Sequence, residues 1–70
     1  MHYQQPMNVY IERSNEHKTL AFTGTAEQLC EELKVNPQTV LIVKDGELIT
    51  EDVDVTDAQE IKLITVVSGG

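Results

Sequence analysis

One segment of this chain has the periodicity of an α-helix, whereas the patterned segments on either side have that of β-strands. Apolar residues recur at the spacing i, i+3, i+4 and i+7, at Ala26, Leu29, Cys30 and Leu33. Thr25, followed three residues later by Gln28, matches a capping box at the start of a helix, and Pro37 favours a stop. The pattern predicts one short amphipathic helix within residues 25–35, which must pack on a sheet.

The segments before this helix alternate between apolar and polar residues, the pattern of strands with one buried face. Met7, Val9 and Ile11 are the apolar positions of the first segment. Polar turn residues at 14–17 and a second alternating run at 19–23 follow. Together they predict an antiparallel hairpin.

The segments after the helix predict three more strands. Residues 39–44 are nearly all apolar and β-branched, which is typical of a strand buried on more than one side. Asp45 and Gly46 favour a tight hairpin turn because both can adopt positive φ, and residues 47–50 form the returning strand. The rest of the chain is predicted as an acidic loop over residues 51–57 and a final strand over residues 60–67.

The order strand, strand, helix, strand, strand, strand predicts an α+β domain of the β-grasp type, a mixed sheet of four to five strands with one packed helix. Seventy residues hold one domain with a thin core, which must be aliphatic because the chain has one Phe and no Trp. A large catalytic cavity is not expected. We expect a flexible leader at residues 1–6, the β-grasp domain at 7–67 and a flexible tail at 68–70.

Composition excludes several classes of function. The formal net charge is -7, which argues against direct binding of nucleic acid. It favours binding to basic patches on other proteins. The alternative is a solvated acidic surface with no dedicated partner. Cys30 is the one cysteine, so no intrachain disulfide can form. The sequence shows no signal peptide and no apolar run long enough to span a bilayer. We therefore expect a soluble cytoplasmic protein.

No group of side chains in the sequence is arranged for catalysis. His2 and His17 fall in polar segments and are expected to be solvated, while Cys30 lies on the apolar helix face and is expected to be buried. Three aspartates alternate in the acidic loop without the length or closing Glu of a calcium loop, at Asp52, Asp54 and Asp57. We expect no metal site, no phosphate-binding glycine loop and no enzyme activity of the chain's own.

Gly69 and Gly70 follow the apolar run 61–67 and Ser68. Because glycine has no Cβ, two in succession give a narrow peptide that can enter a tight channel and present a terminal carboxylate to another protein's active site. The alternative is a frayed terminus, since the last residues of most domains are poorly ordered.

The predicted fold order, the hairpin at 43–47 and above all the ending at 66–70 resemble the ubiquitin-like sulfur carriers. This group includes the small subunit of molybdopterin synthase, the thiamine sulfur carrier, the ubiquitin-related modifier of tRNA thiolation and the archaeal small modifiers. Residues 36–70 resemble most the archaeal modifier and tRNA-thiolation type. The helix region, 25–35, is short for the family.

The resemblance implies chemistry at the Gly70 carboxylate. An ATP-dependent activating enzyme would adenylate it, and a sulfur donor would convert it to a thiocarboxylate, with Gly69 and Ser68 giving clearance. The chain itself would bind no cofactor. Its further partners would be a tRNA thiolase or a molybdopterin or thiamine synthase, or target-protein lysines if the chain is also a ubiquitin-like modifier.

The resemblance also implies an apolar surface for the activating enzyme. Leu48, Ile64 and Val66 would form it if they gather on one sheet face, and otherwise they complete the core. Val66 and Val67 either dock on a partner or simply pack in the last strand. The alternative function is a non-conjugated β-grasp interaction domain in which the two glycines are incidental.

Overall fold

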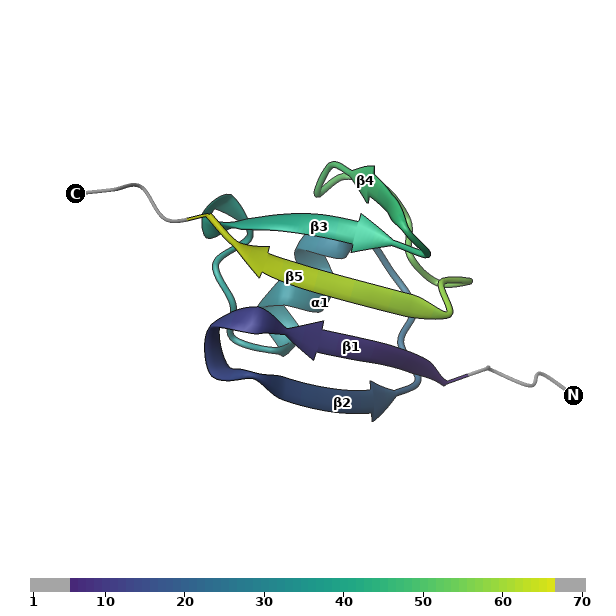
Figure 1. Cartoon of the computed structure of the whole chain (residues 1–70). Helices are drawn as coiled ribbons and strands as arrows, with labels where there is room; N and C mark the ends of the chain where they lie inside the picture. Colours follow the sequence, from purple (N-terminus) through teal and green to yellow (C-terminus); the bar gives the residue numbers. More distant parts are fainter. Residues whose placement is uncertain (1–5, 67–70) are drawn as a thin grey trace, which may run out of the picture.

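The structure, a computed structural model, describes residues 6–66, which form a mixed sheet in the order β2-β1-β5-β3-β4 with α1 packed on one face (Figure 1). The helix and strands are β1 (Met7–Ile11), β2 (Glu16–Leu20), α1 (Ala26–Glu32), β3 (Val40–Lys44), β4 (Glu47–Ile49) and β5 (Glu60–Thr65), with 3-10 turns η1 (Glu12–Ser14) and η2 (Pro37–Thr39). β1 and β5 run parallel, and the other pairs are antiparallel. This is the predicted β-grasp fold.

The core lies between the sheet and α1, and β5 runs through its middle. Ile61 and Leu63 of β5 are fully buried, as are Leu29 and Cys30 of α1. Val55, from the acidic loop, is also fully buried against them. These side chains are all aliphatic or sulfur-containing, as the composition predicts.

The start of α1 confirms the predicted capping box. The Gln28 N–H donates to the Thr25 hydroxyl at 3.3 Å, and the Thr25 N–H donates to Oε1 of Gln28 at 3.0 Å. Both side chains thus satisfy amides that would lack a partner in the first turn.

No helix within the described residues is long and apolar enough to cross a membrane.

The end of α1 differs from the prediction, because the helix stops at Glu32, before the proline can act. Lys34 adopts a left-handed conformation with φ 61°. Its N–H donates to the Glu31 carbonyl at 3.1 Å, and the Val35 N–H donates to the Cys30 carbonyl at 2.8 Å. These two bonds make a Schellman motif, so a backbone reversal at Lys34 ends the helix.

Two strands differ from their predicted form. β2 begins at Glu16, earlier than predicted, and ends at Leu20; as an edge strand it is exposed on nearly every side chain, so its sequence shows no alternation. The strand predicted over 39–44 begins at Val40, and it is not buried on both sides. Leu41 is 47% exposed because α1 covers only one face of the sheet. The apolar run of β3 therefore supplies both core and surface.

The hairpin turn between β3 and β4 follows the prediction. Asp45 and Gly46 have φ values of 48° and 85°, both positive, as a two-residue turn of this kind requires. Asp45 also accepts the backbone N–H groups of Gln59 and Glu60 at 3.0 and 2.9 Å, which fixes the start of β5 beside the turn.

Burial raises the pKa of the Cys30 thiol from 9.0 to about 11, and the carboxylates of Glu51 and Glu27 add to the effect. The neutral thiol is therefore the form that the fold stabilises. The side chain packs as a small apolar group and is poorly placed to react as a thiolate.

Replacing Lys34 by Gly tests the Schellman stop. We expect the free energy of unfolding of Lys34→Gly to exceed that of Lys34→Ala by about 0.5 to 1 kcal/mol. Ala keeps the strain of the left-handed conformation, whereas Gly removes it. The greater entropy of Gly in the unfolded chain offsets part of this gain. Both variants lose the same charge, so chemical denaturation of the pair isolates the backbone effect. Equal stabilities would contradict the left-handed conformation.

The pKa of Cys30 predicts a loss of stability at alkaline pH. The folded pKa lies above the unfolded value, so the unfolded chain releases the thiol proton first as pH rises. Between pH 9 and 11, the free energy of unfolding should fall by about 1 to 2 kcal/mol more in the parent than in Cys30→Ala, as measured by urea unfolding. Parallel pH profiles for the two proteins would show that the thiol is not desolvated.

Candidate functional site

The last two described backbone amides are held from opposite sides where the chain leaves β5. The Val66 N–H donates to the Thr39 carbonyl at 2.9 Å, on the side of β3. The Thr65 N–H donates to Oε1 of Glu12 at 3.1 Å, on the side of β1. Because β1 ends at Ile11, the Glu12 carboxylate takes the place of a strand carbonyl. These two bonds set the direction in which the chain leaves the sheet.

Four of the predicted tail residues, Val67, Ser68, Gly69 and Gly70, lie outside the described residues. Their predicted roles in clearance and in carrying the reactive carboxylate stay predictions. What the structure supplies is the surface around the position from which they continue.

The sheet face opposite α1, called the outer face here, carries an apolar patch. Strand alternation and register place five side chains on it, Leu41, Val43, Leu48, Ile64 and Val66. Leu48 is 62% exposed and Val66 48%, while Ile64 is half-buried. The three predicted interface residues thus share one exposed face and do not complete the core.

Leu41 and Val43 belong to the same patch, although the sequence analysis placed them in a buried strand. In the sheet, Leu41 lies opposite Ile64 and Val43 lies opposite Leu48. No signal in the sequence separates them from the buried Ile42, because residues 40–43 are all apolar and show no alternation between two faces. Across the β3 register the neighbours of the patch are apolar except for Lys62, which lies opposite Val43.

The outer face becomes polar toward β1 and β2. The Tyr10 and His17 rings lie side by side, with centroids 4.6 Å apart, and Lys62 pairs with Tyr10 from β5. Beyond them, the Thr19 hydroxyl donates to Oδ1 of Asn8 at 3.0 Å. The outer face therefore has an apolar half over β3, β4 and the end of β5, and a polar half over β1, β2 and the start of β5.

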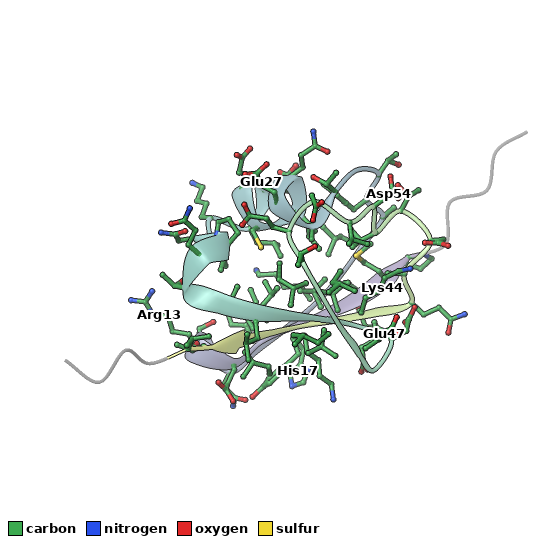
Figure 2. The ribbon with its side chains drawn as sticks, turned by 90° about the horizontal axis from the view of Figure 1, so that it is seen from above. Arg13, His17, Glu27, Lys44, Glu47 and Asp54 are labelled. Carbon is green, nitrogen blue, oxygen red and sulfur yellow. The ribbon has the colours of Figure 1, made fainter. Side chains whose placement is uncertain are left out.

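Acidic side chains of α1 and of the loop after β4 lie on the side of the sheet away from the patch, at Glu27 and Asp54 (Figure 2). Figure 2 shows Glu27 and Asp54 on the helix side of the sheet and His17 on the opposite side. The Thr50 hydroxyl donates to Asp52, and the Thr56 N–H donates to Asp54 at 2.8 Å; these bonds lower the pKa of each carboxyl. The aspartates act as turn acceptors, and within residues 6–66 no group of three side chains could hold a metal ion.

The matches to known proteins agree with this geometry. A model of the ThiS family matches residues 8–70, a span that includes nearly all of the described fold and both glycines. An uncharacterized protein of Archaeoglobus fulgidus is 42% identical over 43 residues, or 61% of this chain, and the match spans 63% of that relative's length. A five-stranded β-grasp sheet matched over this span places the chain in the ThiS family of ubiquitin-like sulfur carriers.

Proposed function

We propose that the Gly70 carboxylate of this carrier is adenylated and then converted to a thiocarboxylate. The match to the ThiS family, which reaches residue 70, carries the proposal. The exposed apolar patch beside the end of β5 supports it, because an enzyme that grips this patch would find the continuing chain next to its contact surface.

The proposed chemistry starts from an unreactive carboxylate. The activating enzyme binds ATP, joins the carboxylate to AMP and releases pyrophosphate, which gives a mixed anhydride with a good leaving group. A sulfur nucleophile then attacks the acyl carbon and AMP departs, so that a C–S bond replaces the anhydride C–O bond. The carrier contributes the acyl group and binds no cofactor of its own.

The patch supplies the docking surface in this proposal. Leu48 and Val66 project to solvent, and the half-buried Ile64 lies on the same face opposite Leu41, so a complementary apolar surface could remove all three from water. Ser68 and Gly69 give the clearance with which Gly70 reaches the active site, and Val67 joins the patch to that tail.

The sulfur would pass to a tRNA thiolase or to a synthase of molybdopterin or thiamine in the cytoplasm. The net charge of -7 favours delivery through a protein over direct contact with tRNA. The same activated carbonyl could be captured by a lysine amine, which would leave Gly-Gly remnants on target proteins. A thiolation or cofactor defect after gene loss would assign the acceptor, and remnant mapping would assign conjugation.

Intact mass spectrometry tests the proposal. Incubation with the host's activating enzyme, ATP and a sulfur donor should raise the mass by the difference between a sulfur and an oxygen atom. Deletion of Gly70 should abolish this gain, and omission of ATP serves as the control. An unchanged mass with an enzyme that thiolates a known carrier would favour a simple interaction domain.

Leu48→Asp tests the docking surface. Because it places a charge in the apolar patch, we expect KM for the carrier to rise about tenfold in adenylate formation, with kcat little changed. Asn8→Asp is the matched control, since it adds the same charge to the polar half of the same face with almost no change of volume. Equal effects of the two substitutions would indicate general electrostatics.

Glu12→Ala tests how the chain is guided out of the sheet. The change removes the acceptor of the Thr65 N–H, so amide hydrogen exchange at Thr65 should accelerate by about fivefold or more, the equivalent of a hydrogen bond of about 1 kcal/mol. Glu12→Gln keeps an acceptor oxygen and should restore most of the protection. Exchange unaffected by either change would exclude Glu12 as the anchor.

A further inference from the structure

A groove of about 700 Å³ opens beside the edge of the sheet and shares Leu41 and Leu48 with the apolar patch. Much of its lining comes from η2, β3, β4 and the loop after β4, through Pro37, Val40, Ile42, Ile49, Glu51 and Val53. Most of these side chains are apolar, and several are only half-buried. The groove is thus an apolar surface that the chain's own fold leaves open.

One wall of the groove is an unpaired stretch of β3. β4 pairs with β3 only from Ile42 to Lys44, whereas β5 pairs with it from Val40 onward. Thr39 accepts the Val66 N–H from the side of β5. Because backbone groups alternate between the two sides of a strand, the N–H and C=O of Val40 point the other way, toward the groove.

The helix start explains why β4 stops short of this edge. The Glu51 carbonyl accepts the Glu27 N–H at 2.8 Å, and the Val53 carbonyl accepts the Ala26 N–H at 2.9 Å. These bonds draw the chain after Ile49 toward α1. In the hairpin register, Glu51 would otherwise have continued β4 opposite Val40. The bonds that cap the start of α1 therefore prevent Glu51 from pairing with Val40 in the sheet.

The rim of the groove is negative. Glu51 lines it, and Glu27 is held beside Glu51 by the bond from the Glu27 N–H to the Glu51 carbonyl. Neither forms an ion pair among the described residues, and no Lys or Arg of that part of the chain lines the groove. A cation at this rim would meet uncompensated negative charge.

We propose that this groove binds an extended segment of a partner protein, with alternating apolar side chains on the groove floor and a Lys or Arg beside Glu51. The segment pairs with the open backbone groups of Val40, which extends the sheet where β4 ends. The proposal does not depend on sulfur chemistry. It gives the carrier a second contact surface, separate from the residues that guide its tail.

An acetylated and amidated peptide, Lys-Val-Thr-Ile-Thr-Val-Thr, is the probe. Titrated into the isotope-labelled full chain, it should shift the amide signals of Val40 and of residues 49–53 in a saturable way, and slow amide exchange at Val40. A peptide with Glu in place of Lys should bind more weakly. A version N-methylated on alternate residues should lose most binding, because it cannot donate the edge hydrogen bonds.

Glu51→Gln should weaken binding of the lysine peptide by about two- to fivefold, as for a partly exposed ion pair. Glu31→Gln, on an exposed part of α1, is the matched control and should leave binding unchanged. Three results would overturn the proposal: no saturable shifts, shifts confined to Ile64 and Val66, or equal binding of the N-methylated peptide. Shifts that depend on protein concentration alone would assign the groove to a second copy of the chain.

Discussion

The pairing of β5 with both β1 and β3 holds this fold together. Within the described residues, β1 and β2 form one hairpin and β3 and β4 another, and β5 joins them in the sheet. Its inward side chains, Ile61 and Leu63, are fully buried. Since α1 covers only one face of this sheet, the core and the open outer face are both organised around the same central strand.

This arrangement places three surfaces on a very small domain, and two of them share Leu41 and Leu48. The apolar patch lies on the outer face where β5 ends, the acidic side chains of α1 lie on the opposite side, and the groove lies at the edge between them. Apolar residues on the surface of a soluble monomer mark interaction sites when they are contiguous. In the proposed function the carrier meets an activating enzyme and then an acceptor, and the patch and the groove would offer these partners two overlapping sets of contacts.

The sequence predicted the element order, the capping box and the turn at Asp45 and Gly46, because each depends on local side-chain chemistry. It failed where tertiary contacts decide. β2 is polar because it is an edge strand. The backbone reverses at Lys34 and not at a glycine, so the residue that usually marks such a helix end is absent from the sequence. The patch was predicted only in part, since a continuous apolar run does not tell which face of β3 lacks a cover.

The anchors of the final strand lay beyond sequence reasoning for a similar reason. Glu12 reaches Thr65 from the far end of the chain, and the groove exists because the start of α1 takes the chain that would have extended β4. Such contacts join residues distant in sequence, and no local pattern encodes them. Two glycines and a family resemblance suggested the chemistry of the tail. The contacts around the end of β5 could be identified only from the folded structure.

The central place of β5 also makes the patch a signal of completeness. Ile64 and Val66 come from the last part of the described chain, and they meet Leu41 and Leu48 only after β5 has inserted between β1 and β3. A chain that lacks β5 would keep only Leu41, Val43 and Leu48 of the five patch residues. Any partner that recognises the patch therefore selects chains that have been synthesised and folded through their final strand.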